Sequence, residues 1–339
     1  MHFKKTILIT GGLGYIGSHT AILLLKKKFN LVIIDNLINS KKSVLSLIEK
    51  ISKKKIIFYK SDIRNEFILN NIFVKHKIDA VIHFAALKYI NESFIHKKEY
   101  FDVNVNGTLN LMTVMKKNNV KNIIFSSSAA VYGDPVKVPI NEDAKIDCKS
   151  PYASTKFESE EIIRSFKNYD PLWRISILRY FNPIGAHESG NIGEDPLGEA
   201  TNVMPLICKS ALNQDNIFTI YGNDYDTYDG TGVRDYIHVM DLAEGHISAL
   251  NYNFNNNDLL ICNLGNGLGV SVLDLIKTFE EVNNVKIKTF FTSRRYRDSA
   301  EVYASTQLAL KKLSWMPKKN LSDMCLDSWR WYSRSVIHN

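Results

Sequence analysis

The sequence has few cysteines and no long apolar run, and each scarcity excludes a class of protein. Its four cysteines lie far apart and form no C-x-x-C pair: Cys148, Cys208, Cys262 and Cys325. This pattern argues against a disulfide framework and against a zinc site. No run of about eighteen apolar residues is present, and the N-terminal apolar segment is too short for a signal peptide. We therefore expect no metal, no membrane partner and a reducing, cytoplasmic location.

Basic residues are in excess but are not concentrated. The net charge is +8, yet the lysines come in short, scattered clusters such as Lys26 to Lys28 and Lys53 to Lys55. No basic stripe is interleaved with aromatic residues, so we expect no nucleic-acid partner. A composition that is 45% hydrophobic and 23% charged is typical of a soluble globular protein.

A glycine-rich turn follows the first apolar run of the chain. Thr10 to Gly17 reads TGGLGYIG and fits two overlapping registers, Gly12, Gly14, Gly17 or Gly11, Gly14, Gly17. In either register, glycines let backbone N–H groups approach a pyrophosphate at a helix N-terminus, although such clusters also serve ordinary tight turns. The next apolar run ends in Asp35, at about the spacing at which an acid meets the adenosine ribose. The two features together predict a dinucleotide site that prefers NAD, because an acid would repel the 2′-phosphate of NADP.

Up to about Tyr180, apolar runs alternate with segments of helical period. The runs continue at Ile56 to Tyr59, Ala80 to Ala85, Ile123 to Phe125 and Ile175 to Leu178, and the helical segments are Glu66 to Phe73, Tyr100 to Met115 and Tyr152 to Phe166. This pattern predicts an α/β fold with a doubly wound parallel sheet of Rossmann type over residues 1–180. Ligands should bind beyond the carboxyl ends of its strands.

The regularity weakens after Tyr180, so residues 181–339 are expected to form a smaller α/β region that mainly binds substrate. Its expected helices are Asn202 to Leu212, Asp241 to Leu250, Val272 to Val282, Gln307 to Leu313 and Leu321 to Ser333, and its expected strands are Ile217 to Ile220 and Leu259 to Cys262.

Tyr152 and Lys156 lie four residues apart in SPYASTK, so a helix would place both side chains on one face. To act as a base near neutrality, a tyrosine pKa must fall from about 10 to about 7. The ammonium one turn away and a positively charged nicotinamide would both lower it. Ser126 to Ser128 follow a predicted strand, where a serine can hydrogen-bond the tyrosine and a substrate hydroxyl. The alternative is that Tyr152 is a buried aromatic residue, that Lys156 is a surface lysine and that the three serines are the polar end of a strand.

Seven segments are distinctive: TGGLGYIGSHT, IDNLINSKKSV, DAVIHFAALK, IIFSSSAAVYG, SPYASTK, LRYFNPIGAH and GTGVRDYIHVMDLAEGH. They resemble the UDP-galactose 4-epimerase family of extended short-chain dehydrogenases/reductases, and the similarity runs from about Thr6 to Trp331. The resemblance implies interconversion of UDP-galactose and UDP-glucose in galactose metabolism, with one tightly held NAD, transient oxidation at C4, turning of the 4-keto sugar and return of the hydride. It also implies a homodimer.

The resemblance assigns roles to individual residues. Tyr152, assisted by Ser128, would remove the sugar proton, and Lys156 would hold the nicotinamide ribose. NAD would also meet Gly11, Gly14, Gly17 and a further set: Tyr15, Ile16, Asp35, Asn36, Asn39, Ser40, Asp62, Ile63, Phe84, Ala85, Lys88 and Phe181. The UDP-sugar would meet Ser128, Tyr152, Asn182, Asn202, Val203, Tyr221, Arg234, Arg295 and Asp298. From the residues alone, Asp62 could equally cap the next helix.

Several positions depart from the family pattern. Val103 stands where the family commonly has an Asn beside the cofactor. Ala130 replaces a common Thr, and Ala86 replaces a common Gly. The segment RRYRD lacks the glycine that the family has before the residue corresponding to Asp298. Val302 stands where a larger side chain often limits the sugar, which suggests some tolerance of UDP-N-acetylglucosamine.

Three rival functions fit the sequence less well. A nucleotide-sugar 4,6-dehydratase needs an acid and a base after the catalytic serine, where this chain has Ala129 and Ala130. A simple dehydrogenase would release NADH and need added NAD for turnover. A non-catalytic dinucleotide-binding regulator should have lost Tyr152 or Lys156, and both are present.

Overall fold

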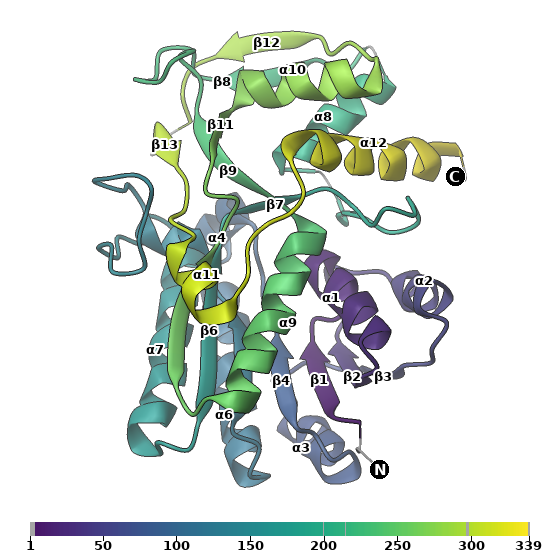
Figure 1. Ribbon diagram of the computed structural model, residues 1–339, viewed down its shortest axis with the longest axis vertical. Coiled ribbons are helices and arrows are strands. Elements are labelled where there is room, and N and C mark those ends of the chain that lie inside the picture. The colour runs from purple at the N-terminus through teal and green to yellow at the C-terminus, as the bar shows by residue number, and fades with distance from the viewer. Residues whose placement is uncertain (1–3, 199, 214, 296–297, 338–339) are drawn as a thin grey trace.

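The computed structural model describes residues 4–198, 200–213, 215–295 and 298–337. At its centre lies a seven-stranded sheet in the order β10-β6-β5-β4-β1-β2-β3, in which every neighbouring pair is parallel (Figure 1). Its strands are β1 (Thr6–Thr10), β2 (Asn30–Asp35), β3 (Ile57–Lys60), β4 (Ala80–His83), β5 (Asn122–Ser126), β6 (Arg174–Tyr180) and β10 (Leu259–Leu264). The predicted doubly wound sheet is confirmed, and its strand order reverses between β1 and β4, where a ligand crevice is expected.

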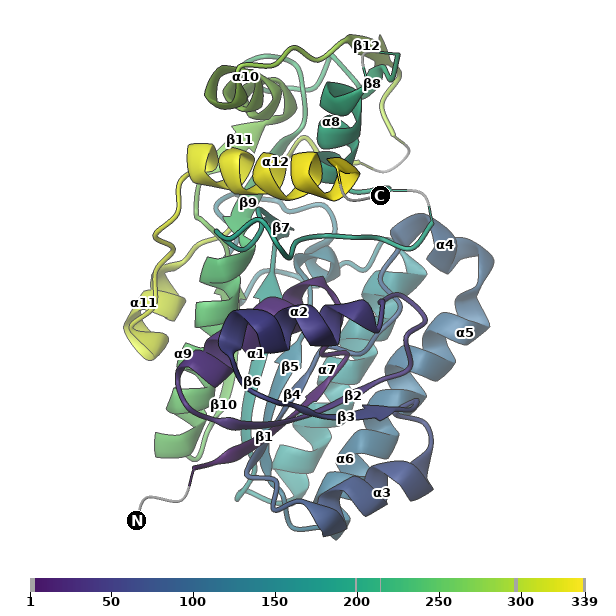
Figure 2. The ribbon, with the colours of Figure 1, turned by 90° about the vertical axis from the view of Figure 1, so that its right-hand side faces the viewer.

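Helices cover both faces of this sheet, which explains why its strands read as almost unbroken apolar runs. On one face lie α1 (Tyr15–Lys26), α2 (Ser43–Ser52), α9 (Val239–Asn255) and α11 (Gln307–Leu313). On the other lie α3 (Glu66–Lys75), α6 (Gly107–Lys117) and α7 (Pro151–Tyr169) (Figure 2). Successive side chains of β1 point to opposite faces of the sheet: Ile7 and Ile9 pack on the first face, and Leu8 packs on the second.

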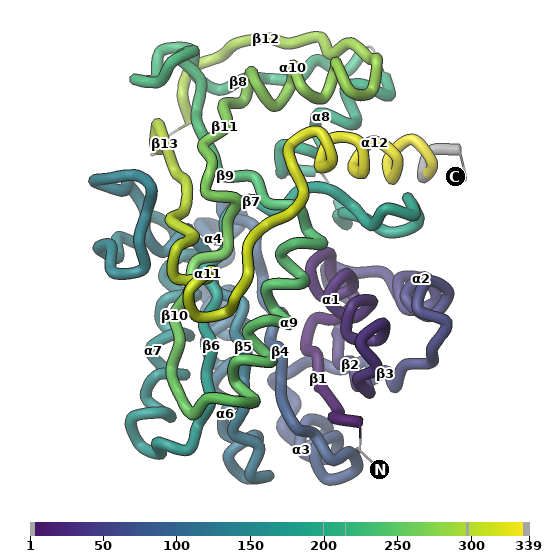
Figure 3. Tube along the Cα trace, in the orientation of Figure 1, coloured from purple at the N-terminus to yellow at the C-terminus, as the bar shows by residue number. Residues whose placement is uncertain are grey.

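The chain leaves the large sheet after β6 and later adds one more strand, β10, to it. Figure 3 follows the trace from β6 into the upper part of the molecule and back down through α9 to β10. β10 pairs with β6 along its whole length, and α9 packs against α1. Residues 239–264 thus belong to the first structural unit, although they lie after the predicted boundary at residue 180. A strand pattern does not identify its partner, so the sequence contains no signal for this return.

The second unit lies over the carboxyl ends of the large sheet (Figure 1). It combines β7 (Asn182–Ile184), β9 (Val233–His238), β11 (Gly269–Ser271) and β13 (Glu301–Val302) with the parallel pair β8 (Phe218–Tyr221) and β12 (Thr289–Thr292). The helices α8 (Val203–Leu212), α10 (Val272–Asn283) and α12 (Leu321–Ile337) surround a separate apolar core. Most of these strands are too short for an alternating pattern to reveal them.

The helix expected over Tyr100 to Met115 is interrupted. After α4 (Ile90–Ile95) come α5 (Lys97–Phe101), a π-helical turn at Asp102–Asn106, and then α6. Asn104 in that turn accepts a hydrogen bond from the Leu87 amide at 2.8 Å and donates to Thr155 Oγ1 at 2.9 Å. The turn thus ties the loop after β4 to α7. No helix in the described part of the chain has the length and apolarity to cross a membrane.

Candidate active site

A cavity of about 1570 Å³ lies between the carboxyl ends of the large sheet and the second unit. All the residues that the sequence analysis assigned to NAD, to the UDP-sugar or to catalysis line it, and so do the divergent positions Ala86, Val103, Ala130 and Val302. Pockets for one drug-sized molecule measure about 300–1,000 Å³. This cavity can therefore hold two ligands side by side.

The glycine turn forms the wall of the cavity above β1. Gly11 has φ +68°, and a Cβ there would lie 2.7 Å from the Ala85 nitrogen. A Cβ on Gly17 would lie 2.4 Å from the Gly11 carbonyl oxygen, so the helix can approach the turn only without one. Gly14 is the N-cap of α1 and offers no capping side chain. The first turn of α1 is therefore open to an anion, as a pyrophosphate site requires.

Asp35 ends β2 and is almost buried. Its carboxylate accepts hydrogen bonds from the Leu13 and Leu37 amides, at 3.0 and 2.9 Å, and from Ser40 Oγ at 2.9 Å. One acid thus ties the glycine turn to the loop after β2. A carboxylate has about four acceptor sites, so this arrangement leaves room for a ribose hydroxyl.

Asp62 follows β3 and pairs with Arg64. Burial raises its pKa, but hydrogen bonds from Arg64 and Asn36 outweigh this and lower the pKa to about 2. The next helix is capped instead by Asn65, whose side chain accepts from the Ile68 amide at 3.1 Å. The capping alternative for the Asp62 side chain is therefore wrong, and its carboxylate remains a charged group on the cavity wall.

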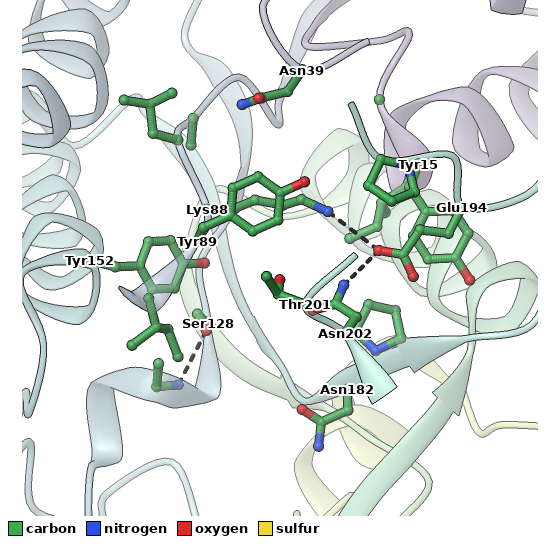
Figure 4. A pocket seen from close by; sticks show the side chains of 18 of the residues that line it. Tyr15, Asn39, Lys88, Tyr89, Ser128, Tyr152, Asn182, Glu194, Thr201 and Asn202 are labelled. Carbon is green, nitrogen blue, oxygen red and sulfur yellow. Dashed lines mark hydrogen bonds and ion pairs between the residues drawn. The ribbon is translucent and has the colours of Figure 1, made fainter. Parts of the chain in front are cut away.

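Tyr152 lies in the first turn of α7, which begins at Pro151 after the N-cap residue Ser150. Ser150 Oγ accepts from the Ala153 amide at 3.2 Å, and Pro151 needs no N–H partner, so this end of α7 is well defined. The tyrosine hydroxyl points toward Ser128, whose Oγ accepts from the Ala130 amide at 3.2 Å (Figure 4). Burial raises the pKa of Tyr152, and hydrogen bonding with Ser128 opposes that rise. The protein by itself therefore keeps Tyr152 protonated at neutral pH.

Lys156 is buried one turn further along α7. Its Nζ donates to the Ser126 carbonyl at 2.8 Å, and burial lowers its pKa to about 7, although Glu160 opposes that change. Glu160 in turn pairs with Arg179, with NH2 and Oε2 2.6 Å apart, and both side chains are buried. This ion pair fixes α7 against β6, so the lysine is held at the end of β5.

Two arginines approach the cavity from the second unit. Arg234 on β9 donates through NH2 to Asp298 Oδ1 at 2.5 Å and to the Ser299 carbonyl at 2.8 Å. Arg295 lies over the Tyr221 ring, with 4.2 Å between the guanidinium carbon and the ring centroid. Arg234 and Arg295, which the resemblance assigns to the UDP-sugar, thus line the same cavity, and Arg234 is already paired with Asp298. Residues 296 and 297 of the RRYRD segment lie outside the described residues.

The structure adds cavity residues that the sequence analysis did not find, including Tyr89, Tyr180, Glu194 and Thr201. Glu194 is buried and accepts hydrogen bonds from Lys88 at 3.5 Å and from Asn202 at 2.5 Å (Figure 4). It belongs to an irregular loop that reads only as rich in Gly, Pro, Asn and Glu. Nothing in such a loop distinguishes a buried acid from an exposed one.

Comparison with known proteins gives a consistent result. The profile of the GDP-mannose 4,6 dehydratase family matches residues 8–328. The UDP-glucose 4-epimerase of Bacillus subtilis is 45% identical over 330 residues, which cover 97% of each chain. The solved UDP-glucose-4-epimerase from Stenotrophomonas maltophila, with bound NAD and formylated UDP-arabinopyranose, matches with a TM-score of 0.97 at 40% identity and covers 99% of this chain and 100% of its own. The enzyme from Bifidobacterium longum, in complex with NAD+ and UDP, matches with a TM-score of 0.94 at 43% identity and covers 98% and 99%.

Proposed function

Since this chain belongs to the UDP-glucose 4-epimerase family, we propose that it interconverts UDP-galactose and UDP-glucose with one NAD held in the cavity. The observation that carries the proposal is the shared cavity: the glycine turn, the Tyr152 hydroxyl and the two arginines all face it. The dehydratase alternative is disfavoured by Ala129 and Ala130, which present methyl groups beside Ser128, where an acid and a base would be needed.

The residues at the cofactor end fit NAD. Gly11 and Gly17 leave a cradle that a Cβ would fill, and Asp35 stands at the end of β2 to meet the adenosine ribose. Further side chains of the cavity that would enclose it include Asn36, Asn39, Ser40, Phe84, Lys88 and Phe181. When bound, NAD supplies the hydride acceptor, and later the donor, for C4 of the sugar.

Tyr152 is the base in this proposal. In its deprotonated form, the Tyr152 phenolate would take the proton of the sugar 4-hydroxyl, becoming the phenol, and would return that proton when the product forms. Because burial raises the pKa of Tyr152, nearby positive charge is needed to lower it. The nicotinamide of NAD would supply one such charge, and Lys156, one turn away, would supply another while it is protonated, although burial lowers its own pKa to about 7. Ser128 hydrogen-bonds the tyrosine and would share the substrate hydroxyl.

The substrate end would hold the UDP group while the sugar turns. Arg234 and Arg295 would grip the diphosphate, Tyr221 would lie beside the uridine, and Asn182, Asn202 and Val203 would flank the nucleotide-sugar. For the hydride to return to the other face, the 4-keto sugar must rotate while its diphosphate stays bound. The cavity of about 1570 Å³ provides the space for that rotation.

The direct test is to incubate the purified protein with UDP-galactose, without added NAD, and to detect UDP-glucose by NMR. Turnover under these conditions identifies a resident cofactor, whereas a simple dehydrogenase would need added NAD. Tyr152→Phe should reduce turnover at least about a thousandfold while NAD stays bound. Tyr252→Phe removes a hydroxyl that bonds Asp258 at the surface and serves as the matched control. Normal turnover by the Tyr152→Phe variant would show that another group is the base.

The homodimer and the cytoplasmic location are also parts of this proposal. Ile95, Phe101 and Leu109, on α4, α5 and α6, expose large apolar side chains, which a second copy of the chain could cover. Sedimentation analysis of the protein and of a Leu109→Glu variant would test the dimer. The scattered free cysteines support a reducing compartment.

A further inference from the structure

Glu194 connects the two ends of the cavity. It lies in the loop between β7 and α8, and only 5% of its surface is exposed. Its Oε1 accepts a hydrogen bond from Asn202 Nδ2 at 2.5 Å and lies 3.5 Å from Lys88 Nζ (Figure 4). Lys88 follows β4 in the first unit, and Asn202 is the N-cap of α8 in the second. A single oxygen atom thus contacts one residue from each unit.

The backbone of Glu194 is held by other contacts. Trp331 Nε1, from α12, donates to the Glu194 carbonyl at 3.0 Å. The preceding Gly193 lies against the same indole, since a Cβ there would stand 2.5 Å from the Trp331 ring. The backbone of Glu194 is therefore held independently of Lys88 and Asn202, which contact its carboxylate.

The charge of Glu194 requires an explanation. A cavity that binds two diphosphates should contain few buried carboxylates, because an acid repels phosphate. The charge can help only through the cation that it holds. The Lys88 side chain is 40% exposed and has a long flexible stem, so without a partner it would lose orientation.

We propose that Glu194 is a positioning residue, which holds Lys88 toward NAD and Asn202 toward the nucleotide-sugar. The inference rests on the proposed function, because that function places these two ligands in the cavity. Asp195 offers a contrast. Its ion pair with Lys41 measures 2.6 Å, but both side chains are more than 40% exposed, and such pairs contribute little.

The test compares Glu194→Gln with Asp195→Asn in the NAD-containing enzyme. Glutamine keeps the size of the side chain and one acceptor for Asn202 but removes the charge opposite Lys88. We expect the KM for UDP-galactose and the rate of NAD loss each to rise about tenfold, with kcat within about threefold of the original. Asp195→Asn should leave all three values within about twofold. The separation of KM from kcat distinguishes positioning from a general loss of folded enzyme.

The opposite result would overturn the proposal. If Glu194 acted only through its negative charge, its removal would leave Lys88 unneutralised, so both ligands would bind more tightly. Glu194→Asp provides the second variant, since it keeps the charge but is one methylene shorter and cannot reach both partners. Positioning predicts weaker binding of both ligands in this variant, whereas a purely electrostatic role predicts no change.

Double variants show which partner transmits the effect. If Glu194 acts on NAD through Lys88, the Lys88→Met and Lys88→Met/Glu194→Gln proteins should lose NAD at the same rate, whereas additive effects would contradict the proposal. Binding of UDP by calorimetry and release of labelled NAD are measured in parallel. These assays do not need turnover, so a protein that binds both ligands normally but does not epimerise would refute the proposed function alone. A Glu194→Gln enzyme with unchanged binding and turnover would refute only the role of Glu194.

Discussion

The two ends of the cavity present different kinds of groups to their ligands: mainly backbone at the cofactor end and mainly side chains at the substrate end. At the cofactor end, the ligand-facing groups are strand ends, a glycine turn and the first turn of α1, all held by the parallel sheet and by Asp35. At the substrate end, side chains from separate segments bond one another, as Arg234 on β9 does with Asp298. A backbone site is complete once the chain has folded. A side-chain site must exchange some internal partners for its ligand.

Lys156 is expected to be an exception at the well-ordered end, where it should destabilise the fold. Burial lowers its pKa from 10.5 to about 7. Between these values the unfolded chain binds a proton that the folded chain does not, so the contribution of Lys156 to stability improves as the pH rises. Below about pH 7 the full penalty, up to about 5 kcal/mol, is present. The Lys156→Met substitution should remove this penalty, but it should also cost about 1–2 kcal/mol because the hydrogen bond to the Ser126 carbonyl is lost.

Urea unfolding of the nucleotide-free protein from pH 6 to pH 10 would measure how the contribution of Lys156 to the free energy of unfolding changes with pH. The Lys156→Met variant should be the more stable protein at pH 6, and its advantage should shrink steadily toward pH 10. It should also be inactive. A stability difference that does not change with pH would contradict the assignment of Lys156 as a buried lysine with a lowered pKa. Lys156 would then not destabilise the cofactor end.

Arg234→Ala tests whether the substrate end acts separately from the cofactor end. Arg234 is mostly buried and is bonded to Asp298 and Ser299, so its loss should free that segment and remove a diphosphate ligand. We expect the KM for UDP-galactose to rise about 30- to 150-fold, equivalent to about 2–3 kcal/mol, with NAD content unchanged. The matched control is Arg294→Ala, whose exposed pair with Asp224 should contribute little. Loss of NAD from the Arg234→Ala variant would show that the two ends are coupled there.

Gly17→Ala tests the backbone end. An added Cβ would lie 2.4 Å from the Gly11 carbonyl oxygen and 2.9 Å from the Gly12 Cα, so either α1 or the turn must shift. Overpacking of this kind costs about 1–3 kcal/mol of unfolding free energy. Gly14→Ala is the matched variant, because its nearest neighbour would be at 3.4 Å, an ordinary contact. Equal stability of the two variants in urea would mean that the close approach at Gly17 is unimportant.

The same contrast explains which features could be predicted from the sequence. The strands of the large sheet and the helices α3 and α7 follow from apolar period, and the cofactor end follows from the glycines and Asp35. The π-helical turn at Asp102–Asn106 was not predicted, because its residues continue an ordinary helical pattern. The return of β10 to the sheet was not predicted either, because strand pairing is a tertiary property.

At the substrate end, prediction depended on resemblance more than on physics. Arg234 and Asp298 were both assigned to the UDP-sugar, but their mutual ion pair could not be anticipated from residues 64 positions apart. Glu194 was missed because it lies in an irregular loop that is held by distant segments, such as Trp331, whose Nε1 donates to the Glu194 carbonyl. Side-chain sites are assembled by contacts between distant segments, and local sequence does not record such contacts.

Val302→Tyr makes the smallest change and acts only on the sugar. Val302 lies on β13, beside Arg234 on β9, and lines the cavity. Valine leaves more room there than tyrosine, so we expect the original protein to convert some UDP-N-acetylglucosamine. The Val302→Tyr variant should lose that activity and keep its UDP-galactose turnover within about threefold, since a change of side-chain size in a pocket is worth about 1–3 kcal/mol between competing substrates. Coupled assays with the two sugars would measure the ratio. If the original protein already rejects the N-acetylated sugar while turning over UDP-galactose rapidly, a feature other than residue 302 limits the pocket, and specificity must then come from the loops around it.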